Sequence, residues 1–102
     1  MDMRKTVYVL AMASLSALAV SAHAYSGQQY ANEAKVSLDN ARATALQARP
    51  GKVTDEELEK ESGGSGLRYS FDIRAGAKTY EVGVDAQTGK VLENKAEGPH
   101  PD

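Results

Sequence analysis

Side chains that could carry out chemistry are few in this sequence, and the densest set is acidic. The acidic run contains Asp55, Glu56, Glu57, Glu59 and Glu61. Such a run could bind calcium or a basic partner, but calcium loops need oxygen ligands at set spacing around a turn glycine, and this pattern is missing. We interpret the run as a solvated, highly charged strand edge. Asp85 to Gly89 resembles a cation loop only faintly, because turn chemistry accounts for every residue in it.

Nucleophiles and metal ligands have equally little support. Ser26, Ser37 and Ser62 have no histidine partner placed by a visible motif, so nucleophilic catalysis is not indicated. His100 is the only histidine beyond residue 24, and we expect it in a solvated tail because a metal site needs several convergent ligands. Cysteine is absent, which excludes disulfides and thiolate metal sites. The sequence therefore predicts that the protein is not an enzyme and that it has no catalytic residue, no metal ligand and no cofactor.

The clearest structural signal is the stretch from Leu67 to Leu92, which predicts three strands joined by two turns. Apolar and polar side chains alternate along it, so one face of the sheet is apolar and the other is wet. The apolar face carries an aromatic row of Tyr69, Phe71 and Tyr80, which we assign to the core. The polar face carries the residues that we predict to bind a partner: Arg68, Asp72, Arg74 and Glu81. Whether this face or the sheet's edges meets the partner is left open.

A helix must cover the apolar face. The segment from Val36 to Arg49 has Ser37 as an N-cap and a mostly alanine face that can approach a sheet closely. The following segment, Lys52 to Glu61, favours helix by propensity, but its position between a helix stop and a Gly-rich loop favours an edge strand, which we choose. The predicted fold is therefore α+β, one helix packed on a three- to four-stranded antiparallel meander sheet.

The first 24 residues have the pattern of a signal peptide. Arg4 and Lys5 precede the uncharged apolar run from Val7 to Val20, and Ala22-His23-Ala24 has the small-x-small form of a cleavage site. The run falls short of the ~20 residues that a spanning helix needs, so we expect cleavage after Ala24 rather than a membrane anchor. The expected location is the periplasm or the exterior.

The rest of the chain divides into three parts. We expect a flexible lead-in over residues 25–35, with a short helical turn as the alternative, a domain over 36–92 and a disordered tail over 93–102. The whole chain has 12 basic and 14 acidic residues, and removing Arg4, Lys5 and Asp2 leaves 10 and 13. This mild excess of acid argues against a nucleic-acid partner. A charged edge favours a monomer or a weak dimer.

Four segments together resemble the PepSY domain family. They are Val36–Ala41 at the helix start, Ala48–Val53 at its exit, the strand Tyr80–Asp85 and the turn Asp85–Val91. The resemblance runs from about Val36 to Leu92. The family usually has a glutamate where Asn40 stands, so the helix cap should be weaker here. The loop from Ser62 to Gly66 is also looser than the family's acidic-glycine turn.

The resemblance implies an exported domain with a helix on an antiparallel sheet. The family is associated, as a proposal, with restraining peptidases, because such domains occur in propeptides of secreted metallopeptidases, and no catalytic residues are attributed to it. The resulting hypothesis is a non-catalytic binding or regulatory module whose partner is a polypeptide, with a peptidase as the specific candidate. The alternative is a cell-envelope sensor domain for a small ligand or a divalent cation.

Overall fold

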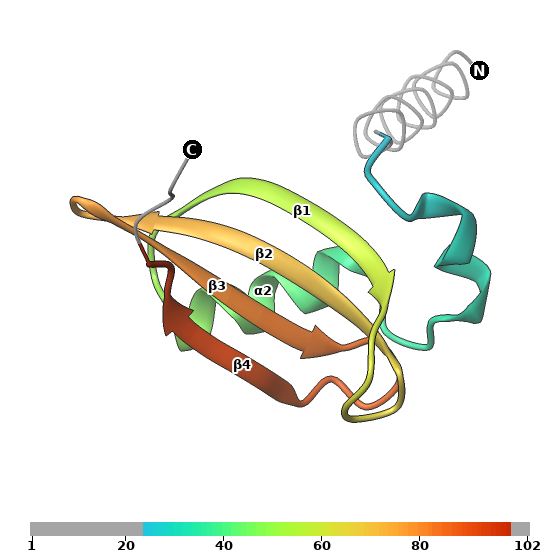
Figure 1. Ribbon diagram of the computed structural model, residues 1–102. Helices are drawn as coiled ribbons and strands as arrows, with labels where there is room; N and C mark the ends of the chain where they lie inside the picture. The colour runs from blue at the N-terminus through green and yellow to red at the C-terminus, as the bar shows by residue number, and fades with distance from the viewer. Residues whose placement is uncertain (1–23, 99–102) are drawn as a thin grey trace, which may run out of the picture.

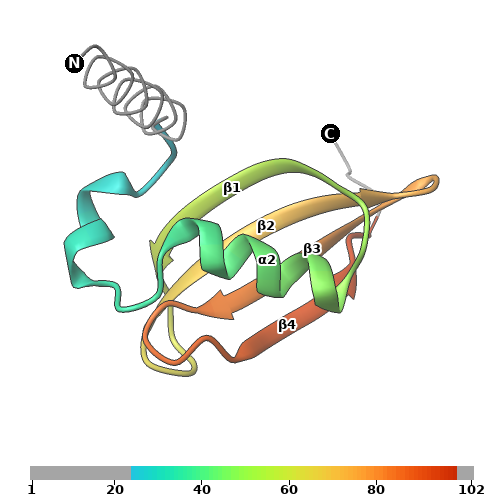
Figure 2. The same cartoon turned by 180° about the vertical axis from the view of Figure 1, so that it is seen from behind.

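One helix lies across one face of a four-stranded antiparallel sheet in the computed structural model, which describes residues 24–98 (Figures 1 and 2). The elements are η1 (Gln28–Glu33), α2 (Leu38–Ala48), β1 (Lys52–Lys60), β2 (Leu67–Ala75), β3 (Lys78–Asp85) and β4 (Val91–Ala96). Strand order in the sheet follows chain order, so the α+β meander is confirmed, as is the assignment of the segment after α2 to an edge strand. The predicted signal peptide up to His23 and the predicted tail residue His100 lie outside the described residues.

The helix begins and ends where local chemistry predicts. Ser37 has extended backbone and its Oγ accepts a hydrogen bond from the Asn40 N–H at 3.1 Å, so it is the N-cap. The helix stops at Ala48, one residue short of the expected end, because Arg49 before Pro50 already has extended backbone. Ala41 and Ala45 are fully buried against the sheet, which shows that the alanine face permits the close approach.

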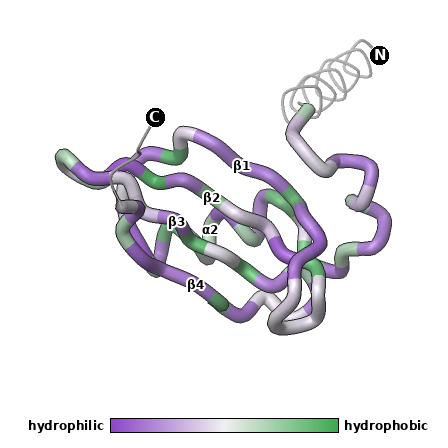
Figure 3. Tube along the Cα trace, viewed as in Figure 1, coloured by the Kyte–Doolittle hydropathy of each residue, from purple (hydrophilic) through white to green (hydrophobic). Residues whose placement is uncertain are grey.

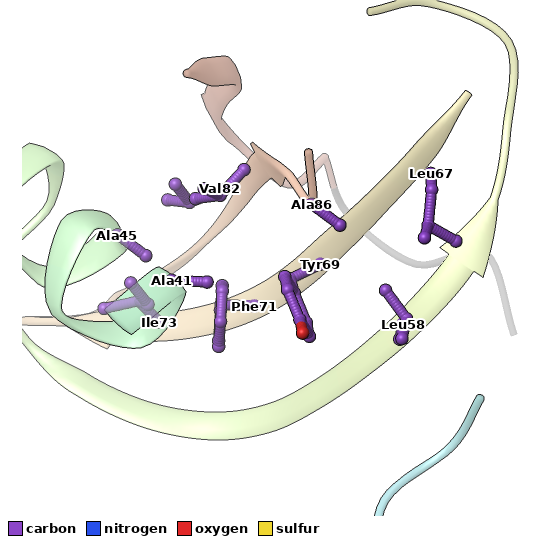
Figure 4. Packing of buried hydrophobic residues seen from close by; sticks show 10 residues of the cluster. Ala41, Ala45, Leu58, Leu67, Tyr69, Phe71, Ile73, Val82 and Ala86 are labelled. Atoms are coloured by element: carbon purple, nitrogen blue, oxygen red, sulfur yellow. The ribbon is translucent and has the colours of Figure 1, made fainter. Parts of the chain in front are cut away.

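The core lies between α2 and the sheet (Figure 4). Tyr69 and Phe71 are buried as expected, and the Tyr69 hydroxyl donates a hydrogen bond to the Val36 carbonyl at 2.7 Å. Tyr80 is only half-buried, and the Arg49 guanidinium lies 3.8 Å from its ring centroid. The alternation of apolar and polar residues that produces this layer is visible along β2 in Figure 3. The aromatic row is therefore largely core.

The folded unit is longer at its N-terminal end than residue 36. Residues 25–35 were expected to form a flexible lead-in, but they include the short 3-10 helix η1, and Tyr25 and Tyr30 pack against the edge of the core. The contact that sequence reasoning missed is between Ser26 and Glu57, which form a parallel β-bridge. Because the paired residues are far apart along the chain, no short pattern in the sequence indicates this pairing.

The last strand is also longer than expected. The tail was placed from Glu93 onward, but β4 runs to Ala96 and the Glu97 N–H still donates to the Thr79 carbonyl. The prediction of a tail was based on the low apolar content of the segment after Leu92. The structure shows why a polar segment can pair: Asn94 receives a hydrogen bond from Arg49 and donates one to the Ala48 carbonyl at the end of α2.

Candidate functional site

The candidate site is the face of the sheet opposite α2, which we call the open face. No other element of residues 24–98 lies over it in either view (Figures 1 and 2). Residues directly opposite each other in antiparallel strands share a face, so the register assigns its members. Its charged members within the strands are Lys52, Asp55, Glu57, Glu59, Arg68, Asp72, Arg74, Glu81, Asp85, Glu93 and Lys95.

At one end of this face the charged side chains pair with groups of the chain itself. We call this the closed end and define it as Arg68, Asp85, Glu93 and the loop Ser62–Gly66. The Asp85 carboxylate accepts four hydrogen bonds: from the Ser65 N–H and hydroxyl and from the N–H groups of Gln87 and Thr88. Burial alone would raise the pKa of Asp85, but these donors outweigh it and lower the pKa to about 2. The carboxylate therefore ties the loop to the turn after β3, and the predicted turn chemistry of Asp85 is confirmed.

Arg68 belongs to the same network. It is only 8% exposed, although it lies on the open face, because its guanidinium rests on Gly83. Its Nη1 lies 3.3 Å from the Glu93 carboxylate and its Nη2 donates to the Ser62 carbonyl at 3.4 Å. A Cβ at Gly83 would approach Nη1 to 3.1 Å, so the glycine gives the guanidinium its space. Arg68 is therefore packed into the closed end rather than available to a partner, although its buried Nε has no hydrogen-bond partner among the described residues.

Further along the open face lies a group of carboxylates with a different environment. We call it the acidic patch and define it as Asp55, Glu57, Asp72, Glu81 and Glu97. Asp72 lies between Asp55 on β1 and Glu81 on β3. Burial raises the pKa of Asp72 to about 6, helped by a hydrogen bond with Glu97 and by the charges of Glu97, Asp55 and Glu81. Asp72 therefore holds its proton more tightly than an isolated aspartate does.

Glu57 and Glu81 show the same effect. Burial raises the pKa of each, and neighbouring carboxylates raise it further. Among the described lysines and arginines, none forms a salt bridge with Asp72 or Glu81. Lys95 stands opposite Glu81 in the register, but its Nζ lies 3.2 Å from a Glu93 oxygen instead. Asp72 and Glu81 can therefore attract a cationic group of a partner.

The four predicted binding residues all lie on the open face, but the structure brings only two of them together. Asp72 and Glu81 are directly opposite in the register of β2 and β3. Arg68 is enclosed in the closed end. Arg74 is exposed near the β2–β3 turn, where its Nε donates to the Gly76 carbonyl at 3.4 Å. The arginines and the carboxylates therefore do not form one mixed site.

Three members of the patch were not among the predicted binding residues. Asp55 and Glu57 were assigned to a solvated edge, although their spacing of two residues on a strand would have placed them on one face. Glu97 was assigned to the tail, and no local signal identifies it. It reaches the patch only because β4 continues further than its composition suggests.

The described residues contain no group of three or more histidine, cysteine, aspartate or glutamate side chains arranged to hold a metal ion. Over the same part of the chain, neither helix has the length and apolar character of a membrane span. What the open face offers is a negative field and a set of hydrogen-bond acceptors on a rigid sheet.

Comparison with protein families gives one match. The family described as peptidase propeptide and YPEB domain, abbreviated PepSY, matches residues 35–95, which include α2 and nearly all of the sheet. The chain belongs to the PepSY family. PepSY domains are generally non-catalytic regulatory modules and are typically found in exported proteins. No curated protein and no solved structure matches the chain significantly.

Proposed function

We propose that this PepSY domain is an exported, non-catalytic module that binds a polypeptide and restrains a peptidase. The observation that carries the proposal is the acidic patch on an uncovered sheet face, in a domain whose family includes peptidase propeptides. A filled core and a flat charged face suit recognition of a protein surface. The predicted signal peptide supports export.

The patch also indicates the chemistry of the partner. Neighbouring carboxylates raise the pKa of Asp72 and of Glu81, so a lysine or arginine placed beside them relieves a repulsion as well as forming ion pairs. Binding such a cation lowers the pKa of Asp72 and releases its proton. Affinity for a cationic segment should therefore be greatest above pH 6 and should weaken as Asp72 becomes protonated below it.

The test is an inhibition assay with the full chain. The purified protein is titrated into the secreted peptidases of its host, and cleavage of a protein substrate is followed at pH 7.5. The patch variant Glu57→Gln/Glu81→Gln removes two negative charges. Its matched control is Ala43→Lys/Gln47→Lys, which adds the same charge at exposed positions of α2.

We expect the patch variant to inhibit about tenfold less well, since two ion pairs of ~0.5–1 kcal/mol each are lost. The control variant should inhibit as the unmodified protein does. Equal weakening of both variants would mean that net charge, rather than the patch, decides the interaction. Absence of inhibition by the unmodified protein at any concentration would refute the proposed function.

A further inference from the structure

One contact in the structure departs from the pattern of the sheet. All strand pairs are antiparallel, but Ser26 forms an isolated parallel bridge with Glu57 on the outer edge of β1. The Leu58 N–H donates to the Ser26 carbonyl at 2.8 Å. An edge strand presents unpaired backbone groups, and here one residue of the same chain, Ser26, pairs with them. The edge of β1 therefore accepts an extended polypeptide in parallel orientation.

The segment that supplies this strand is residues 25–34, which we call the strap. It lies beside β1 in both views of the ribbon (Figures 1 and 2). Its attachments include contacts of one lysine: the Lys60 Nζ lies 3.1 Å from a Glu33 oxygen and 4.9 Å from the centroid of the Tyr30 ring. The Gln87 side chain donates to the Glu33 carbonyl at 2.6 Å.

The domain does not depend on the strap for its core. No residue of the strap is buried, and none belongs to the buried hydrophobic cluster, although Tyr25 and Tyr30 pack against its edge. Its one regular element, η1, is a 3-10 helix of six residues, a weak structure without tertiary support. A segment with few buried contacts can detach while the rest stays folded.

Glycine is required where the strap crosses the edge. Gly27 has φ 84°, and a Cβ there would overlap the Leu58 carbonyl. Tyr25, two residues earlier, packs against the core edge. A segment that pairs with β1 in this way is therefore best served by glycine at the crossing point and an aromatic residue two positions earlier, as in Tyr25 and Gly27.

We propose that the edge of β1 at Glu57 and Leu58 is a binding site for a polypeptide segment with glycine at the crossing point and an aromatic residue two positions before it, and that the strap occupies this site as a competitor. Backbone hydrogen bonds would supply the affinity and the glycine and aromatic positions the selectivity. The inference deepens the proposed function, because it names a backbone site for the polypeptide partner and a way to regulate it. It needs no peptidase for its test.

The experiment displaces the strap and then supplies it as a free peptide. In the full chain, Gly27→Ala places a Cβ against the Leu58 carbonyl and should release the strap. The probe is a labelled synthetic peptide with the sequence of residues 24–34, and binding is measured by fluorescence anisotropy. Gly98→Ala is the matched control protein, since a Cβ there meets nothing within 4 Å. A probe with alanine in place of the glycine is the control peptide.

We expect the probe to bind Gly27→Ala about tenfold or more tightly than it binds the unmodified chain or Gly98→Ala, because the strap no longer competes. Hydrogen exchange of the Leu58 amide should become faster in Gly27→Ala and slow again when the probe is added. The alanine probe should not bind. Equal affinity for all three proteins, or an unchanged Leu58 amide in Gly27→Ala, would overturn the inference.

Two further measurements are needed. One checks that Gly27→Ala is folded, and the other distinguishes the edge site from the proposed inhibition of a peptidase. If near-ultraviolet circular dichroism shows that Gly27→Ala is unfolded, Tyr25→Ala/Tyr30→Ala replaces it, because that variant loosens the strap without a steric overlap and carries the same expectations. Peptidase inhibition is measured separately. Probe binding without inhibition would leave the edge site standing and refute the peptidase role, whereas inhibition without probe binding would do the reverse.

Discussion

Asp72 and Asp85 lie on the same face of the same sheet, on neighbouring strands, yet their carboxylates behave in opposite ways. Asp85 is buried among four hydrogen-bond donors, and its pKa falls to about 2. Asp72 is half-buried among carboxylates, and its pKa rises to about 6. The difference comes from the neighbours, not from the residue type or the face. The Asp85 carboxylate is therefore fully paired within the chain, whereas Asp72 and Glu81 carry charge that a partner can compensate.

The largest expected effect comes from breaking the closed end with Asp85→Asn. Asparagine keeps one oxygen for Gln87 and Thr88 but turns an NH2 group toward the Ser65 N–H, which then has no acceptor. We expect a loss of ~2–4 kcal/mol in the free energy of unfolding at pH 7, measured by urea denaturation. Asp55→Asn, on the exposed β1 edge, should change it by less than ~0.5 kcal/mol. A loss no larger than that of the control would contradict the structural role of Asp85.

The same substitution has a defined pH dependence. The pKa of Asp85 is lower in the folded protein than in the unfolded chain, so its contribution is present above about 4 and is lost as pH falls through about 2. The stability difference between the unmodified protein and Asp85→Asn should therefore shrink between pH 4 and pH 2.

Next in size is Gly83→Ala, which tests the packing of Arg68. The new methyl group would lie 3.1 Å from Nη1 of Arg68 and 3.5 Å from Cβ of Glu93, so the guanidinium must move away from its buried position. We expect a loss of ~1–2 kcal/mol in the free energy of unfolding, as is usual for overpacking. Gly98→Ala, with open space around it, is the control. If both variants unfold at the same urea concentration, Arg68 is not held against Gly83.

A smaller effect of opposite sign is expected for Asp72→Asn. The pKa of Asp72 is raised in the folded protein, so its carboxyl contributes most below about 4, and that contribution is lost as pH rises through about 6. Removing the charge should stabilise the protein by ~1 kcal/mol at pH 7.5 and by almost nothing at pH 4. The full shift would correspond to ~3 kcal/mol, but solvent screens a half-exposed group.

Urea denaturation at the two pH values measures this change. Glu61→Gln is the control, because Glu61 is exposed and is not among the groups that raise the pKa of Asp72. Added salt should reduce the gain from Asp72→Asn, since it screens the repulsion. A destabilising effect at pH 7.5, or a gain that is equal at both pH values, would show that the patch does not repel itself.

The sequence predicts the parts of this comparison that depend on local rules. The Ser37 cap, the Asp85 turn and the common face of Asp72 and Glu81 follow from capping, turn chemistry and strand alternation. The burial of Arg68 was not predictable, because it depends on a loop and a glycine from other segments. The lengths of β4 and of the N-terminal segment depend on pairing with distant residues, whose register no short pattern specifies.

The smallest effect tests whether the acidic patch acts as one network. Asp55 raises the pKa of both Asp72 and Glu57, whereas Glu57 and Asp72 do not raise each other's. Glu57→Gln alone should stabilise the protein by ~0.3–0.5 kcal/mol at pH 7.5, as expected for a half-exposed charge. In the double variant Glu57→Gln/Asp72→Asn, the two changes in the free energy of unfolding should add. In the double variant Asp55→Asn/Asp72→Asn, the total gain should be smaller than the sum of the two separate gains, by a few tenths of a kcal/mol (~0.3). Double-mutant cycles from urea denaturation measure both. Additivity in both pairs would mean that the carboxylates act independently, and a partner's cation would then gain nothing from bridging them.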